Sequence, residues 1–257
     1  MTPRDRIRFS SITRAGWLAT LILLFHGHAL GQPTKPGITL LPDVAELHRL
    51  QLIAKLEAIT GWTDLEFDNA GRLRRSDQPP VGGSSAARSL LDRAMSGQQT
   101  ILIEDASRDS EVVFARVRFA QWKTLASGGS PVSVIEIDFA DFQHVTGDHL
   151  ALQAFDVGWV VLHEVHHIVD DSLDSDRADA AGECEGHINA MRRERSLPER
   201  GEYFFTFLPA AGDSVFAFRF VRLAFETELA GTRRKYWLVW DATLVGGIRS
   251  REIASLR

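Results

Sequence analysis

The chain has 257 residues, of which 44% are hydrophobic and 25% are charged, and its formal net charge is −5. This composition is typical of globular proteins and excludes wholesale disorder, collagen and disulfide-rich miniproteins. The negative charge and the lack of a basic stripe argue against nucleic-acid binding, which depends on clustered lysine and arginine side chains. Cys184 is the single cysteine, so the chain cannot form an internal disulfide.

The first 31 residues have the features of a secretory signal peptide. Four arginines and one acid flank the start of an apolar run over residues 15–25, and Ala29 and Gly31 supply small residues at a cleavage site. A membrane anchor is the competing interpretation, but the run is shorter than the about 20 apolar residues that a span needs. We therefore expect residues 1–31 to be removed, no stable membrane insertion afterwards, and a periplasmic or extracellular protein with a charge of about −8.

Residues 32–98 are predicted to form an N-terminal helical and hairpin region. Apolar residues at helical spacing predict an amphipathic helix within 40–60. An Asn-Ala-Gly turn in 65–73 predicts a short hairpin, and residues 74–86 are a polar loop or linker. A short helix is expected at 87–95.

Residues 99–257 are predicted to form a single α+β domain. Alternating apolar residues indicate strands, and apolar residues at a spacing of three and four indicate helices. The predicted helices cover 148–170, where Asp148 and Asp156 are both possible N-caps, and 177–195. The predicted strands are 100–104, 111–119, 132–139, 215–225 and 235–240.

The sequence His163-Glu164-Val165-His166-His167 contains the pattern HExxH in an apolar, helix-forming stretch. Residues four positions apart lie on one face of a helix, so the first and last histidines can bind one metal ion. The glutamate projects beside them, and its carboxylate can take a proton from water and return it to a leaving nitrogen. The pattern therefore predicts a Zn2+ site with Glu164 as the general base.

A catalytic zinc site of this type needs a third protein ligand, and the sequence offers several. The pattern HExxHxxGxxH is excluded, because Asp170 and Leu173 stand where it requires glycine and histidine. Glu183 and Glu185 on the next predicted helix are two candidates. The aspartates of the acidic segment 170–179 are candidates as well, namely Asp170, Asp171, Asp174, Asp176 and Asp179.

Helical phase favours Glu185 among these candidates. The buried face of the second helix is marked by apolar residues at spacings of three and four, which are Ala181, Cys184, Ile188 and Met191. With about 100° per residue, Glu185 lies about 80° from the centre of this face, whereas Glu183 points about 120° away. We therefore expect His163, His167 and Glu185 to bind zinc, with Asn189 holding the Glu185 carboxylate.

The segment HEVHH at 163–167, followed by Glu185, resembles the zincin metallopeptidases, and among them the gluzincins. In that family both histidines and a later glutamate bind zinc, and the glutamate of HExxH is the general base. The resemblance implies the same roles here, in a fold whose small mixed sheet packs on the HExxH helix and whose second helix carries a ligand. Two departures are a shorter spacing to the later glutamate and Asn189 in place of the usual aspartate. Residues 188–200 are also similar to a segment of uncharacterised bacterial proteins with HExxH.

The zincin resemblance also implies a substrate-binding strand and a donor that stabilises the oxyanion. In that family the edge strand of the sheet holds an extended substrate by backbone pairing. Val132–Phe139 is the strand that we expect in this place. His166, His187 and Tyr203 are the candidate donors.

These observations predict an exported zinc metallopeptidase that acts on protein or peptide substrates. The second hypothesis is a catalytically inactive, zinc-stabilised exported module that binds a partner or a surface. A metal-dependent hydrolase of cell-wall peptides or small amides is a third hypothesis. The patterns GxSxG, GxGxxG and GxxxxGK[ST] are absent, so serine-hydrolase, dinucleotide-binding and P-loop functions lack support.

Overall fold

The computed structural model describes residues 36–107, 109–119, 132–177, 180–208 and 219–246. These residues form an α+β fold, as predicted, and their contacts group them in one compact unit. The predicted signal peptide, residues 1–31, lies outside the described residues. Within the described ranges, none of the helices has the length and apolar character needed to cross a bilayer.

The first sheet has four strands in the order β1-β4-β6-β5. β1 (Gly37–Leu40), β4 (Thr100–Asp105) and β6 (Val132–Ile137) run parallel, and β5 (Ala115–Phe119) runs antiparallel to β6. The expectation that Val132–Phe139 forms the edge strand is wrong, because β4 and β5 occupy both sides of β6. β5 is the edge strand of this sheet in the described chain.

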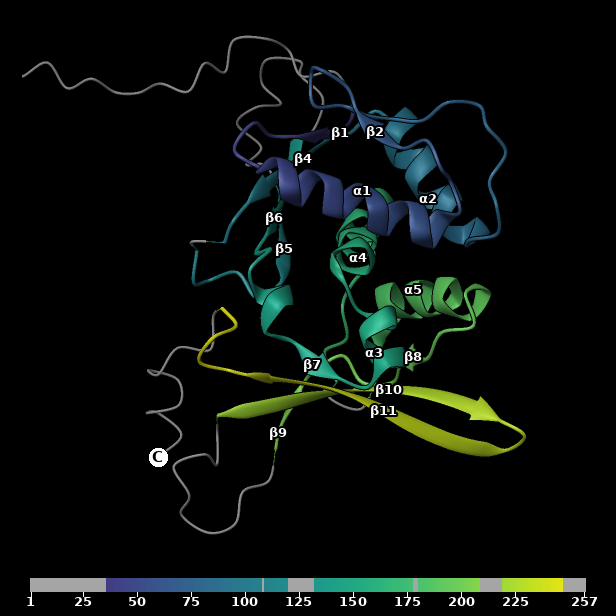
Figure 1. Ribbon diagram of the computed structural model, residues 1–257, viewed down its shortest axis with the longest axis vertical. Helices are drawn as coiled ribbons and strands as arrows, with labels where there is room; N and C mark the ends of the chain where they lie inside the picture. The colour runs from purple at the N-terminus through teal and green to yellow at the C-terminus, as the bar shows by residue number, and fades with distance from the viewer. Residues whose placement is uncertain (1–35, 108, 120–131, 178–179, 209–218, 247–257) are drawn as a thin grey trace, which may run out of the picture. The chain divides into compact units, whose positions relative to one another are not determined.

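The predicted HExxH helix lies between this sheet and two further helices. α1 (Glu46–Thr60) and α2 (Ser85–Ser96) contact one side of α4 (Val157–Asp170), and β5 and β6 contact another (Figure 1). α4 is therefore buried almost all round, which accounts for its nearly uniform apolar sequence. One apolar core contains residues of β1, α1, α2, β4 and α4. The described elements of region 32–98 therefore pack together with those of region 99–257.

The predicted helical stretch 148–170 is two helices, and each of the two possible N-cap residues begins one. Asp148 precedes α3 (His149–Ala154), and Asp156 precedes α4. The Asp156 carboxylate accepts hydrogen bonds from the backbone N–H groups of Gly158 and Trp159, at 3.0 and 3.3 Å. Gly158 does not interrupt α4; it permits close packing, because a Cβ there would lie 2.9 Å from a side chain of α1.

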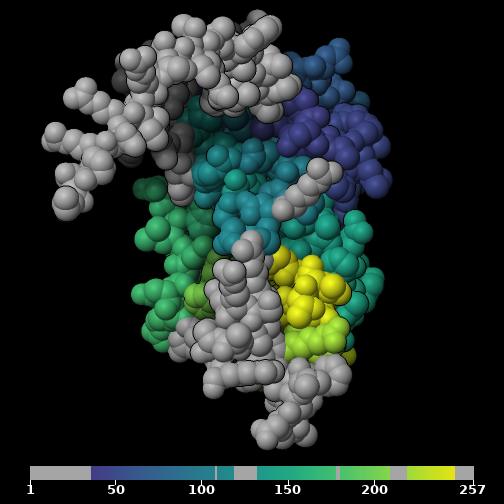
Figure 2. All heavy atoms as spheres, turned by 90° about the vertical axis from the view of Figure 1, so that its left-hand side faces the viewer, coloured from purple at the N-terminus to yellow at the C-terminus, as the bar shows by residue number. Residues whose placement is uncertain are grey.

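A long hairpin dominates the C-terminal part of the described chain. β10 (Phe220–Leu229) and β11 (Thr232–Asp241) pair antiparallel around a turn at Ala230 and Gly231. Three short strands, β7 (Thr146–Gly147), β8 (Glu199–Arg200) and β9 (Thr206–Phe207), complete this second sheet. A second apolar cluster packs α3 against the hairpin. Figure 2 shows yellow residues near the C-terminal end of the described chain and purple residues near its N-terminal end on one face, with blue and teal residues between them.

The second predicted helix is α5 (Gly182–Glu194), which packs on α4. It begins later than the predicted residue 177, because the chain first makes a loop that returns toward α4. The predicted hairpin is confirmed by β2 (Glu66–Phe67) and β3 (Leu73–Arg74), which pair antiparallel.

Candidate metal centre

His163 and His167 bring their imidazoles together on one face of α4, as the HExxH spacing predicts. Their Nε2 atoms lie 3.0 Å apart. The side chains are largely buried, because α4 packs against α5 and the sheet around them. Zinc sites have three or four protein ligands, so an ion bound by both Nε2 atoms requires only one or two further ligands close to them.

Asp174 supplies the third atom at this point. Its Oδ1 lies 3.1 Å from Nε2 of His163 and 3.2 Å from Nε2 of His167. Tetrahedral zinc with bonds of about 2.0–2.1 Å places its ligand atoms about 3.3 Å apart. The three atoms thus form a triangle of the size that one zinc ion requires, and the donor set of two imidazoles and a carboxylate suits this metal.

The loop between α4 and α5 positions Asp174 over the histidines. Asp171 ends α4 in the left-handed conformation with φ of 50°, which turns the chain back along the helix. A β-bridge between Asp174 and Gly182 then fixes the loop at its far end. Gly182 has φ of +82°, and a Cβ there would lie 2.5 Å from the backbone nitrogen of Ser175, so only glycine allows this approach.

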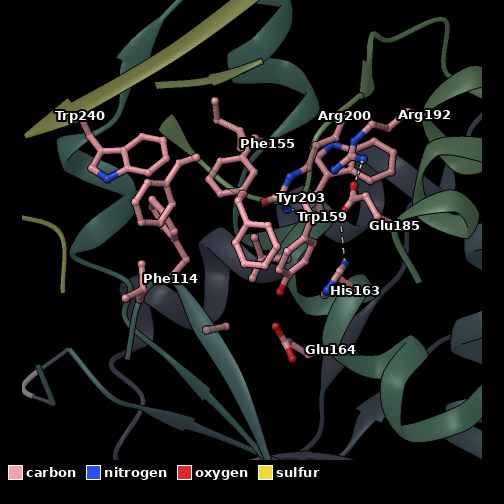
Figure 3. A pocket seen from close by; sticks show the side chains of 16 residues that line it. Phe114, Phe155, Trp159, His163, Glu164, Glu185, Arg192, Arg200, Tyr203 and Trp240 are labelled. Carbon is pink, nitrogen blue, oxygen red and sulfur yellow. Dashed lines mark hydrogen bonds and ion pairs between the residues drawn. The ribbon is translucent and has the colours of Figure 1, made fainter. Parts of the chain in front are cut away.

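The second ring nitrogen of each histidine is held by a protein acceptor. Nδ1 of His167 donates to the backbone carbonyl of Ser172, at 2.7 Å. Nδ1 of His163 lies 3.2 Å from Oε2 of Glu185 (Figure 3). Such contacts orient metal-binding imidazoles and leave Nε2 for the ion. Glu185, predicted as a ligand, therefore contacts the ring nitrogen of His163 that is turned away from Asp174.

Glu185 belongs to a buried network of charges. It is 1% exposed, as the helical phase predicts, and it forms ion pairs with Arg192, which is 2% exposed, and Arg200. Asn189 does not hold Glu185 directly: its Oδ1 accepts from Arg192 and from the backbone N–H of Arg200, both at 2.8 Å. Burial opposes ionisation of Glu185, but the two arginines and His163 hold its pKa well below the usual range. These ion pairs hold the Glu185 carboxylate in place next to Nδ1 of His163.

Cys184 is the fourth member of the group. Atoms of Cys184, Asp174 and the two histidines all lie within 4.8 Å of one another, and together they can hold a metal ion. The Cys184 sulfur is 3.5 Å from Nδ1 of His163. Burial opposes the thiolate, but the surrounding histidines lower the pKa of Cys184 to about 5. The buried thiol of Cys184 is thus part of the polar group.

Glu164 lies beside this group with its carboxylate directed into a cavity (Figure 3). Among the described residues, it has no hydrogen-bond partner. Burial raises the pKa of Glu164 to about 7, although the neighbouring His163 and His167 act in the opposite direction. A carboxyl group with this pKa can both accept and release a proton near neutral pH.

Of the three candidate oxyanion donors, the structure brings only Tyr203 to the centre. Its hydroxyl donates to Oδ2 of Asp174, at 2.7 Å, and its ring lines the same cavity as Glu164. His166 instead contacts Ser172 and Asp170, at 2.7 and 3.2 Å, and stacks on His187. His166 reaches the group through Cys184, whose pKa it helps to lower, and not through the triangle of His163, His167 and Asp174.

The remaining candidate ligands lie away from the centre. Glu183 is exposed on α5, and Asp170 forms an ion pair with Arg93. Asp179 lies outside the described residues. Sequence reasoning missed Arg192 and Arg200 altogether, although Arg192 follows Glu185 by two helical turns and so shares its buried face.

Comparison with known proteins identifies no relative: no family model, no curated protein and no solved structure matches this chain. The protein is therefore described by its fold and by its cluster of polar side chains. The described chain is an α+β protein in which histidine, aspartate and cysteine side chains gather at a place that can hold a metal ion.

Proposed function

We propose that this protein is an exported zinc-dependent peptidase with a zincin-like core. The observation that carries the proposal is the triangle of His163 Nε2, His167 Nε2 and Asp174 Oδ1, with sides of 3.0–3.2 Å, beside the Glu164 carboxylate. In this proposal Asp174 takes the place of Glu185 as the third ligand, and Glu185 positions His163. Three protein ligands are typical of catalytic zinc, which keeps a position open for water or substrate.

The roles of the residues follow from their places. Bound zinc supplies Lewis-acid polarisation of a carbonyl group and activates water. Glu164 takes a proton from the attacking water and delivers it to the nitrogen of the cleaved peptide bond. The Tyr203 hydroxyl, which donates to Asp174 in this structure, would turn its single O–H from that carboxylate to the developing oxyanion.

The edge strand β5 supports a peptide as the substrate. α4 packs against β5, and in the described chain β5 pairs on one side only. An extended peptide that added to this edge would run alongside the helix that carries Glu164. In this proposal a peptide bond of the added strand would lie near the Glu164 carboxylate.

Digestion of an unstructured protein tests the proposal. We expect the zinc-loaded protein to cleave casein, a chelator to stop cleavage, and added zinc to restore it. The metal also stabilises the fold, by about 2.7 kcal/mol at a free zinc concentration 100 times the Kd. Digestion that continues unchanged after complete removal of metal would contradict the proposal.

A second candidate function rests on Cys184. Zinc bound by four protein ligands is typical of structural sites, and Cys184 would complete such a set with the two histidines and Asp174. The protein would then be a zinc-stabilised binding module. The same digestion separates the two functions: the module predicts metal-dependent melting without cleavage of casein.

A further inference from the structure

A cavity of about 260 Å³ opens directly beside the proposed catalytic residues. Its polar lining residues are His163, Glu164, Glu185, Arg192 and Arg200, and the rest of its wall is apolar or aromatic (Figure 3). Sites for whole drug-sized ligands have volumes of about 300–1,000 Å³. This cavity is smaller, so its size suits one large side chain.

Three rings of the aromatic wall belong to the second apolar cluster and come from separate parts of the chain. Phe114 precedes β5, Phe155 joins α3 to α4, and Trp240 lies on β11. The ring of Phe114 meets those of Phe155 and Trp240 edge-on, with centroids 5.0 and 5.3 Å apart. This is the spacing at which aromatic rings attract one another, and another ring entering the cavity would find the same geometry.

Phe114 has a backbone conformation that is unfavourable for a phenylalanine. Its φ is 61°, which bulky residues rarely adopt. Its N–H donates to Oδ2 of Asp141 and its carbonyl accepts from the backbone N–H of Asp138, both at 2.9 Å. A strained residue that neighbours fix in this way is typical of a functional site.

The polar groups of the cavity favour an uncharged occupant. The guanidinium of Arg200 is satisfied by Glu185 and by the backbone carbonyls of Glu202 and Tyr203. Arg192 is likewise paired with Glu185 and with a backbone carbonyl. The donor groups of both guanidiniums are thus engaged within the protein, with Glu185 as the one carboxylate that they share.

We propose that this cavity is the specificity pocket, and that it selects an aromatic side chain next to the cleaved bond. The inference rests on the proposed peptidase function. Trp240 lines the cavity with its ring, while its indole nitrogen is buried. Val160 precedes Glu164 by one turn of α4 and also lines the cavity, so its size controls how much room an entering ring has.

Peptides that differ at one residue test the pocket. We expect kcat/KM to be at least about tenfold higher for a peptide with phenylalanine next to the cleaved bond than for its alanine counterpart. Val160→Phe fills the cavity and should bring this ratio near one while alanine peptides are still cleaved. Val145→Phe is the matched control, because Val145 is a half-buried valine of the same apolar cluster that does not line the cavity.

Binding in the Glu164→Gln background separates a wrong pocket from a wrong function. We expect calorimetry to give an at least about tenfold lower Kd for the phenylalanine peptide than for the alanine peptide, and Val160→Phe to remove the difference. If this holds without any cleavage by the wild type, the pocket stands and the peptidase function fails. If peptides are cleaved and bound without aromatic preference, or if Val160→Phe leaves the preference intact, the pocket assignment is overturned and the peptidase function stands.

Discussion

We expect the Glu164→Gln variant to lose peptide hydrolysis by at least about 100-fold, because a positioned general acid–base contributes about 10²–10⁴-fold to a rate. Glutamine has nearly the same shape as glutamate but cannot accept the proton of the attacking water. Glu164 is not a member of the group of His163, His167, Asp174 and Cys184 that could hold a metal ion, so the variant should bind zinc as the wild type does. Single-turnover kinetics and metal analysis on the same preparation measure both properties.

Glu183→Gln is the matched control for this substitution. Glu183 is exposed on α5, so the same chemical change there should leave both zinc content and kcat/KM unchanged. A Glu164→Gln variant that carries full zinc and retains wild-type turnover would remove Glu164 from the mechanism.

We expect Glu185→Gln to lower the free energy of unfolding by about 3–5 kcal/mol, because it leaves buried arginine charges without their carboxylate. Arg192 is 2% exposed and makes its ion pair with Glu185 entirely inside the protein. Urea denaturation measures the loss. Glu199→Gln is the control: Glu199 pairs with Arg193 at the surface, where such pairs contribute about 0–1 kcal/mol.

The same variant should also change how stability depends on pH. The pKa of Glu185 in the folded protein is below its value of about 4.3 in the unfolded chain. Its ionised carboxylate therefore stabilises the fold above about pH 4.3, and this contribution is lost as the pH falls below that value. Wild type should lose more stability than Glu185→Gln on acidification. Equal losses in both proteins would show that the carboxylate is not held in the buried ion pairs.

Loss of the Glu185 carboxylate should also weaken zinc binding, by about 10–100-fold, where the variant remains folded. The carboxylate lies 3.2 Å from Nδ1 of His163 and fixes the ring with Nε2 toward the proposed metal. A partial loss of zinc affinity in Glu185→Gln would indicate that Glu185 orients His163. A much larger loss would indicate that Glu185 binds the metal directly.

The sequence predicted the parts of the site that depend on helical periodicity. The HExxH spacing correctly predicted that two imidazoles lie on one face of α4. The helical phase of α5 correctly predicted that Glu185, rather than Glu183, is buried. The third ligand that we propose, Asp174, could not be derived in this way, because it lies in a loop. Its place is set by the left-handed turn at Asp171 and the bridge to Gly182, and neither has a periodic signal.

The same limit applies to the sheets. Alternating apolar residues predicted β4, β5 and β6, but pattern alone does not give strand order, and β6 proved internal rather than an edge strand. The short strands β1, β7, β8 and β9 were not predicted, since segments of two to four residues show no period and form through pairing with neighbours. β8 matters for the site, because it places Arg200 against Glu185.

Metal content is the most direct test of the central claim that His163, His167 and Asp174 hold zinc. We expect mass spectrometry to find one zinc per folded wild-type chain, the same for Asp176→Ala and Cys184→Ser, and a loss of zinc for Asp174→Ala at equal free metal. Asp176 is the matched control because it is an exposed aspartate of the same loop. A folded Asp174→Ala protein that keeps its zinc, or a Cys184→Ser protein that loses it, would contradict the account.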